Sequence, residues 1–232
     1  KPDIEVLECG CGPGTVTFEI AKKVINGSVI GIDINKDQID SNNNKVYESN
    51  INNLKFELAD ILELPYPDNS FDIVYMQALI VHIKSPIDAI REVYRVLKKN
   101  GLIALREPIM DKTIFSPEMT ILEESFELIQ KAILSYGGDA SVGCKLLPLI
   151  QEAGFINNQI SVSWEQPDSL DQWPAFYKGW SNVFSGRIGE IIVDEGWCDK
   201  KHINKIIRSW KKLGKEKTGF AASPWGEAVG SK

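Results

Sequence analysis

A run of glycines directly after a short apolar segment is the feature that most constrains how this chain can fold. Residues 5–8 form the apolar-weighted segment, and Gly10, Gly12 and Gly14 follow it at alternate positions. A strand that meets a glycine-rich turn and then a helix is typical of the first unit of a parallel α/β sheet. Such a turn brings bare backbone N–H groups and a helix N-terminus to the edge of the sheet where ligands bind.

Strand-like and helix-like segments alternate after this turn as far as about residue 108. The second strand, residues 28–33, is apolar until its acidic end, which is typical of a strand buried in a parallel sheet. Alternation of this kind predicts a doubly wound α/β fold with helices on both faces of the sheet. The other expected strands are residues 54–59, 71–76 and 102–105, and the expected helices begin near Thr15, at Lys36 and at Ser85, the last with a buried face that extends to Leu97.

The regular alternation of strands and helices ends beyond Pro108. Helices are expected at about residues 117–135 and 145–153, a strand at 156–164, a helical Trp-rich stretch after it, and a strand-like end at 220–232. We therefore expect a mostly parallel, seven-stranded sheet with a helical cover. In this division residues 1–165 form the ligand-binding core, residues 166–218 the cover, and residues 219–232 the closing strand of the core sheet.

The charge balance of the chain bears on its partners. The 232 residues carry a formal net charge of -6 and the pI is about 5.1. The average surface charge is therefore negative, which disfavours nucleic acid and anionic membranes as partners. The longest basic cluster, Lys200 to Lys217, alternates with apolar residues and is interpreted as one amphipathic helix with a solvated face. A small-molecule partner is expected, and the oligomeric state is left open.

Cysteine and histidine usage disfavours disulfides and metal. Cys9 and Cys11 are the only close cysteines, and with just two histidines in the chain the paired ligands of a zinc site are missing. No apolar run is long enough to span a membrane and the first residues are not a signal peptide, so a cytoplasmic protein is expected.

The glycine spacing helps to choose between nucleotide-like ligands. A dinucleotide fingerprint reads G-x-G-x-x-G, whereas this chain reads G-x-G-x-G and has Thr15 where the last glycine would fall. Three carboxylates surround the turn: Glu8 before it, Asp33 at the end of the second strand and Asp60 after the third. Acids without Lys or Arg suit a cation that carries an ammonium, a diol and an adenine but no phosphate, as S-adenosylmethionine does.

The motifs resemble those of a known family. The segment from Val6 to Thr15 resembles the first motif of class I S-adenosylmethionine-dependent methyltransferases, and Ile30 to Asp33 resembles their second-strand motif. Residues 59–61, 64–72 and 97–102 resemble the remaining motifs of the branch that includes ubiquinone and menaquinone biosynthesis methyltransferases, with methyltransferase domains of types 11 and 25. The resemblance covers about residues 4–108 and implies a Rossmann-like fold. From Ile109 onward only a general similarity remains.

The resemblance implies roles for particular residues. Asp33 would hold the ribose, Ile34 and Ile61 would sandwich the adenine, and Asp60 would meet its amine. The remaining cofactor candidates are Glu8, Cys9, Gly10, Gly12, Gly14 and Ala59 around these positions and Gln77 by the amino-acid moiety. Each has a plainer alternative: the acids could cap the next helix, the glycines could form only a tight turn, and Cys9 could be a small filler of that turn.

Methyl transfer from a sulfonium is a displacement for which alignment and desolvation can supply most of the rate. A general base is needed only when the acceptor must lose a proton, and His82 is the candidate, with a packed histidine as the alternative. Trp173, Tyr177 and Trp180 have helical spacing and are candidates for an apolar acceptor pocket, although they could equally form the core of the cover.

The expected function is transfer of a methyl group from S-adenosylmethionine to a small molecule, which leaves S-adenosylhomocysteine. Two alternatives stay open at this stage: an NAD(P)-dependent oxidoreductase, which the glycine spacing and Asp60 disfavour, and a relative that binds the cofactor without turnover.

Overall fold

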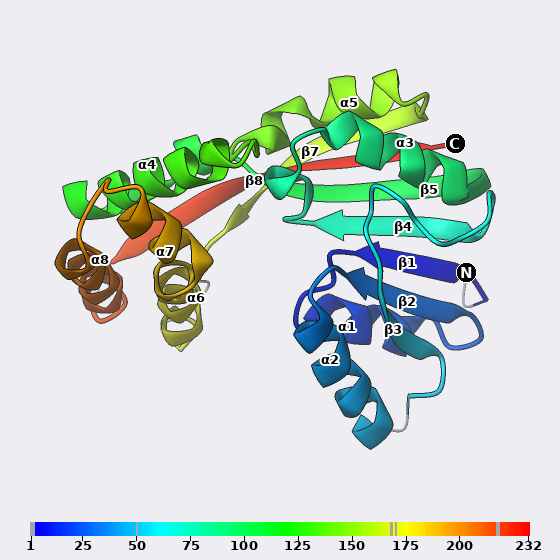
Figure 1. Cartoon of the computed structure of the whole chain (residues 1–232), viewed down its shortest axis with the longest axis horizontal. Helices are drawn as coiled ribbons and strands as arrows, with labels where there is room; N and C mark the ends of the chain where they lie inside the picture. The colour runs from blue at the N-terminus through cyan, green and yellow to red at the C-terminus, as the bar shows by residue number, and fades with distance from the viewer. Residues whose placement is uncertain (1–2, 50, 168, 170, 217–218) are drawn as a thin grey trace.

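The computed structural model describes residues 3–49, 51–167, 169, 171–216 and 219–232. One sheet, in the order β3-β2-β1-β4-β5-β8, runs through the core, with β7 paired to the far side of β8 and the short β6 paired to its start (Figure 1). The strands are β1 (Glu5–Cys9), β2 (Ser28–Asp33), β3 (Leu54–Leu58), β4 (Phe71–Gln77), β5 (Leu97–Pro108), β6 (Ile114–Ser116), β7 (Ile156–Glu165) and β8 (Phe220–Ser231).

The direction of each strand matches the expected fold class. Strands β1 to β5 pair in parallel, and β8 runs antiparallel to β5, β6 and β7. The chain leaves β1 toward β2 on one side and returns to β4 on the other, so the order of the strands reverses at β1. The prediction of a Rossmann-like, mostly parallel sheet of seven strands is confirmed, with β6 as a short eighth strand. Crevices at such reversals are where open α/β sheets bind ligands.

Two apolar clusters cover the two faces of the sheet. One contains Val6, Val29 and Phe56 with residues of α1 and α2, and the other contains Leu7, Val74 and Ile103 with residues of α3 and α5. Period-two alternation along the strands sends successive side chains to opposite faces. The core helices are α1 (Thr15–Lys23), α2 (Lys36–Ser49), α3 (Pro86–Val96) and α5 (Leu146–Glu152).

Helix α2 forms although its asparagines are poor helix formers, because two of them bond to neighbouring backbone. The Asn42 amide donates to the Gly12 carbonyl at 2.8 Å, and Asn43 exchanges two hydrogen bonds with the backbone of Phe56 in β3. Another expectation is corrected. Leu97, expected on the buried face of the helix that begins after Ser85, is instead the first residue of β5 and pairs with Phe71, since α3 ends at Val96.

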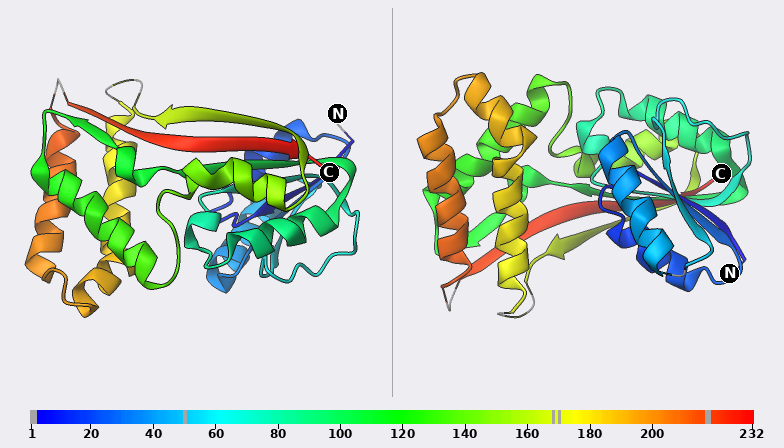
Figure 2. Two further views of the ribbon diagram at one scale, coloured as in Figure 1. Left: turned by 90° about the horizontal axis from the view of Figure 1, so that it is seen from above. Right: turned by 60° about the horizontal axis from the view of Figure 1, so that its bottom comes forward.

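The remaining helices form a lobe of their own beside the core. They are α4 (Thr120–Ser135), α6 (Trp173–Ser185), α7 (Arg187–Asp194) and α8 (Lys200–Leu213). The long strand β8 runs from this lobe into the core sheet, as Figures 1 and 2 show. Helix α4 packs against α7 and α8, so residues expected in the core also contribute to the cover. The three-part division at residues 165 and 218 stays a prediction.

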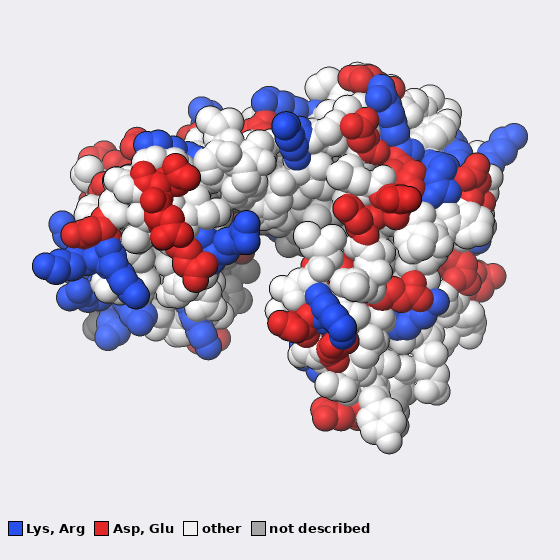
Figure 3. Space-filling view, viewed as in Figure 1, with Lys and Arg blue, Asp and Glu red and all other residues white. Residues whose placement is uncertain are grey.

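Figure 3 shows a deep notch between this lobe and the core. Among the described residues, no helix has both the length and the apolar composition needed to cross a bilayer.

Candidate functional site

A cavity of about 300 Å³ lies where the carboxyl ends of β1, β2 and β3 meet the segment after β4. Its two acids, Asp33 and Asp60, come from the ends of β2 and β3, whereas His82, Lys84 and Tyr136 come from the segment after β4 and from the end of α4. The expectation of acids without Lys or Arg is therefore corrected, because Lys84 also lines the cavity. The lining residues are Gly10, Ile32, Asp33, Ile34, Ala59, Asp60, Ile61, Leu62, Leu79, His82, Ile83, Lys84 and Tyr136. The structure thus brings six of the expected cofactor residues into one place with His82.

The glycine turn has a backbone that only glycine adopts without strain. Gly10, Gly12 and Gly14 have φ angles of 71°, 47° and 78°. A Cβ on Gly10 would lie 2.8 Å from the Leu79 side chain, and one on Gly14 would lie 2.9 Å from the Phe56 ring. A Cβ added to Gly12 would meet no atom of the described chain within 4 Å. The turn is therefore tightly packed at Gly10 and Gly14, whereas Gly12 has free space on the side where a Cβ would lie.

Asp33 fixes the turn. Its Oδ2 accepts a hydrogen bond from the Gly12 N–H and its Oδ1 accepts one from the Asn35 N–H, both at 2.9 Å. The Asn35 side chain, not Asp33, accepts from the N–H groups of Asp37 and Gln38 at the start of α2. Asn35 therefore caps α2, and Asp33 does not. A carboxylate has about four lone-pair sites, so Asp33 keeps acceptor capacity for a ligand.

Asp60 lies one strand further along, in a loop rather than before a helix. Its Oδ1 accepts from the Leu62 N–H at 2.9 Å, and it lines the cavity. The two isoleucines beside these acids differ in exposure: Ile61 is buried, whereas Ile34 is 74% exposed. An exposed apolar side chain next to a buried one offers two surfaces against which a flat ring could pack.

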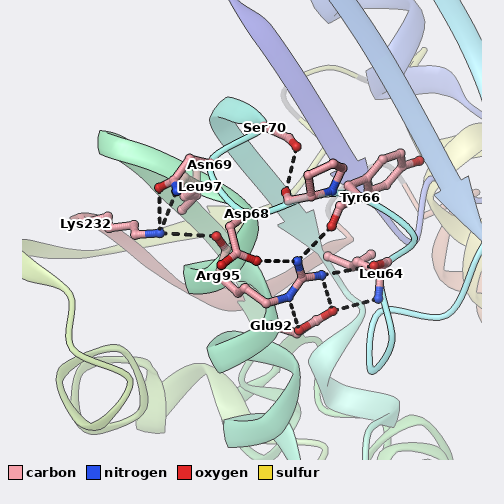
Figure 4. Close-up of polar contacts among 10 residues, drawn as sticks. Leu64, Tyr66, Asp68, Asn69, Ser70, Glu92, Arg95, Leu97 and Lys232 are labelled. Carbon is pink, nitrogen blue, oxygen red and sulfur yellow. Dashed lines mark hydrogen bonds and ion pairs between the residues drawn. The ribbon is translucent and has the colours of Figure 1, made fainter.

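A partly exposed ion-pair network around Arg95 holds the loop that carries Asp60 and Ile61. The Arg95 guanidinium donates to the carbonyls of Leu64 and Tyr66 at 3.0 and 2.8 Å and to the carboxylates of Glu92 and Asp68 at 2.7 and 2.9 Å. Figure 4 shows these contacts converging from α3 on the loop. The Arg95 side chain holds the pKa of Glu92 below its usual range. The loop is thereby anchored to the core.

Glu8 on β1 is a buried carboxylate with unused bonding capacity. It is 3% exposed, and its Oε2 has no hydrogen-bond partner among the described residues. Burial raises the pKa of this carboxyl to about 7. A buried polar atom without a partner is unfavourable by about 1–3 kcal/mol, so such atoms cluster at functional sites. Glu8 pairs with Tyr75 in the sheet, behind the turn rather than in the cavity wall.

Two other cofactor candidates, Gln77 and Cys9, lie outside the cavity lining. The Gln77 Oε1 accepts from the Tyr75 hydroxyl at 2.5 Å, and Gln77 does not line the cavity. Cys9 is fully buried beneath the turn, and burial raises the pKa of its thiol far above the usual range, which disfavours thiolate chemistry.

His82 lines the cavity from the short segment after β4. Its Nδ1 lies 2.9 Å from the Tyr136 hydroxyl at the end of α4. Partial desolvation by the surrounding residues lowers the pKa of the imidazole, although the ring remains reachable from solvent. A neutral, oriented imidazole of this kind is able to accept a proton near neutral pH.

Sequence reasoning missed Glu107 at the end of β5. Its side chain is fully buried and accepts three backbone hydrogen bonds: from Leu79 at 3.0 Å, Ile80 at 3.1 Å and Val81 at 3.2 Å. Burial raises the pKa of Glu107 to about 7, against the lowering effect of these three bonds. The segment that Glu107 holds carries Leu79 and His82 into the cavity. An acid at the end of an apolar strand, as with Asp33, was the signal that could have found it.

The three aromatic candidates for the acceptor pocket lie elsewhere. Trp173 is buried in the cover, Trp180 stacks on Trp210 with ring centroids 5.6 Å apart, and Tyr177 packs against Gly214. The structure does not bring them into the cavity with Asp33 and His82. Their packing favours the alternative that they form the core of the cover, and their role toward an acceptor stays a prediction.

Known proteins share this architecture and sequence pattern. A family model described as a methyltransferase domain matches residues 1–218. An uncharacterized methyltransferase of Schizosaccharomyces pombe is 27% identical over 94% of this chain and 81% of its own length. A demethylmenaquinone methyltransferase of Lactobacillus johnsonii is 34% identical over 44% of this chain and 42% of its own length. The chain therefore spans less than half of that relative.

A solved structure gives the same picture of the fold. A SAM-dependent methyltransferase of Methanosarcina mazei superposes with a TM-score of 0.60 over 100% of this chain and 93% of its own, at 18% identity. The oxidoreductase alternative receives no support from these comparisons.

Proposed function

Because this chain belongs to the family of methyltransferase domains and its cofactor is S-adenosylmethionine, we propose that it methylates a small-molecule acceptor by in-line displacement. The observation that carries this proposal is that Asp33 and Asp60 both line one cavity, together with Gly10 of the glycine turn. Acidic acceptors and a bare backbone at a strand-order reversal match a cationic adenosyl ligand better than a pyrophosphate.

The residues present fit that cofactor. Asp33 would accept from the ribose hydroxyls and Asp60 from the adenine amine, while Ile34 and Ile61 would contact the two faces of the ring. The orphaned Oε2 of Glu8 and the amide of Gln77, on neighbouring strands behind the turn, would serve the ammonium and carboxylate of the methionine part. Gly10 and Gly14 would keep the turn low enough for the ligand to approach its backbone.

When bound, S-adenosylmethionine supplies a methyl group on a sulfonium, which is an activated leaving group. The chain's own residues then have to orient the acceptor, exclude water and, where the acceptor carries a proton, remove it. His82 would do the last: if its Nδ1–H donates to Tyr136, the Nε2 lone pair is free to accept a proton. The apolar walls from Leu62, Leu79 and Ile83 would desolvate the reacting groups.

Two measurements test the proposal. Calorimetry should detect binding of S-adenosylmethionine and S-adenosylhomocysteine, with no comparable heat from NAD or NADP. A metabolite extract incubated with protein and a methyl-labelled donor should then yield a labelled product by mass spectrometry. Tight binding of the donor with no labelled product from any extract would leave a non-catalytic relative as the better description, and tight binding of NAD alone would overturn the cofactor assignment.

A further inference from the structure

Helix α8 presents most of its basic residues in one line on the outside of the cover. The helix begins after Asp199, whose side chain accepts from the His202 N–H at 2.7 Å. The apolar residues of α8 face the inside of the cover, where Trp210 is stacked on Trp180. The buried positions are Ile203, Ile206, Trp210 and Leu213.

The basic residues lie opposite this buried face. Five of them, Lys201, Lys205, Arg208, Lys212 and Lys215, are separated by four, three, four and three positions. In a helix of 3.6 residues per turn this spacing keeps the four within α8 on one stripe, which spans about 16 Å at 1.5 Å per residue. Lys215 follows two residues after the helix ends at Leu213. All five are exposed. We call these five residues the basic stripe; Lys200 and Lys211 lie along its flank.

No ion pair is seen between the stripe and an acid in the described part of the chain. Among the residues that the structure describes, none of the five has a carboxylate oxygen within 4.0 Å, whereas Lys22, Lys36 and Lys55 elsewhere are paired. Figure 3 shows the Lys and Arg side chains gathered at the end of the lobe that α8 forms.

This arrangement changes what the net charge implies about partners. A net charge of -6 averages over the chain, and it predicts repulsion from anionic surfaces only when the charges are evenly mixed. Charge attraction is local, because the screening length at physiological salt is about 8 Å. A cationic stripe longer than this length therefore acts independently of the acidic remainder of the chain.

We propose that the basic stripe docks the cover on an anionic phospholipid bilayer. A straight row of cations on a convex helix matches a flat anionic surface, and clusters of four to eight Lys or Arg on an amphipathic helix are typical of electrostatic binding to anionic lipids. The apolar face of α8 is buried in the cover, so only the charged face would meet the lipid. Single-stranded nucleic acid is a poorer match because its sites add aromatic side chains for base stacking. The exposed positions of α8 include no aromatic residue, since Trp210 is buried. The inference does not depend on the identity of the acceptor.

Vesicle co-sedimentation tests this docking with the full chain and no cofactor. The wild type should sediment with vesicles of 30% phosphatidylserine in phosphatidylcholine and not with pure phosphatidylcholine vesicles, and 0.5 M NaCl should release it. The variant Lys205→Gln/Arg208→Gln/Lys212→Gln should lower partition about 100-fold, as expected at about 1 kcal/mol for each cation. The matched control Lys23→Gln/Lys99→Gln/Lys178→Gln removes the same charge from exposed positions elsewhere and should keep wild-type partition.

Three outcomes would overturn the docking proposal: equal binding to pure phosphatidylcholine, equal losses in the two triple variants, or tighter binding to duplex DNA or soluble polyglutamate than to the anionic vesicles. Calorimetry with S-adenosylmethionine on the stripe variant keeps this result separate from the proposed function. Retained cofactor binding with lost vesicle binding supports the stripe alone.

Discussion

The Oδ2 of Asp33 accepts a 2.9 Å hydrogen bond from the backbone N–H of Gly12. The acid at the end of β2 and the turn after β1 are therefore one structural unit, although 21 positions separate them in the sequence. A ligand that engages the carboxylate meets a turn whose position the same carboxylate fixes. Preorganisation of this kind reduces the ordering that binding requires.

Replacing Asp33 with Ala should weaken S-adenosylmethionine binding by about 1–3 kcal/mol, because a charge-assisted acceptor is lost and the Gly12 N–H loses its partner. Calorimetric titration measures the change. Glu48→Ala, an exposed acid on α2, serves as the control and should bind as the wild type does. Unchanged affinity in Asp33→Ala would remove the ribose assignment.

Substitution of Gly10 by Ala should reduce both stability and cofactor affinity. Gly10 has φ +71°, and the new Cβ would lie 2.8 Å from the Leu79 side chain, so we expect a loss of about 1–2 kcal/mol in the free energy of unfolding. Urea denaturation measures it. Gly179→Ala on α6, where no described atom lies within 4 Å of the added Cβ, should instead be neutral or stabilise by up to about 1 kcal/mol. Equal effects at the two positions would contradict the strained-turn argument.

Buried Glu8 should make the stability pH-dependent in a defined direction. Burial raises its pKa to about 7 in the folded protein from 4.5, so the folded state retains a proton that the unfolded chain releases. The resulting stabilisation is fully present below pH 4.5 and is lost as the pH rises to about 7. Its size is on the order of 3 kcal/mol. Urea denaturation between pH 4.5 and 7.5 should show a shallower decline in Glu8→Gln than in the wild type, and identical slopes would refute the shift.

The sequence predicted the half of the site that local pattern determines. Gly10, Gly12 and Asp33 belong to motifs in which residue type and spacing follow from the backbone. In the structure Gly10 and Asp33 line one cavity, and Gly12 donates a hydrogen bond to Asp33. Glu107 and Tyr136 were not found because their partners, Val81 and His82, are distant in the sequence and contact them only through the packing of β5 and α4.

Tertiary packing also determines what the Trp-rich stretch contacts. Helical spacing places Trp173, Tyr177 and Trp180 near one face of α6, but it does not say what that face contacts. In the folded lobe the face meets Trp210 of α8 and Phe126 of α4, with the Trp180 ring centroid 4.6 Å from that of Phe126. A pocket and a core have the same apolar signature in sequence, and only the tertiary contacts separate them.

Glu107→Gln should loosen the segment that carries Leu79 and His82. The Gln carbonyl can replace Oε1 as acceptor, but its amide would face the Val81 N–H, which loses its acceptor at a cost of about 1–3 kcal/mol. Amide hydrogen exchange should show lost protection at residues 79–81, and Glu123→Gln, an exposed acid on α4, should leave it intact. Protection equal to wild type in Glu107→Gln would show that other contacts hold the segment.

The pair of Tyr136 and His82 should control the pH profile of turnover when the acceptor carries a proton. The Tyr136 hydroxyl lies 2.9 Å from Nδ1 and contributes to the desolvated environment that lowers the pKa of His82. Tyr136→Phe removes the oriented partner while keeping the ring, so kcat should fall several-fold with KM for S-adenosylmethionine unchanged. His82→Asn should abolish the acidic limb of the profile altogether. A profile that is the same in both variants and the wild type would mean that His82 takes no proton, and that alignment alone supplies the rate.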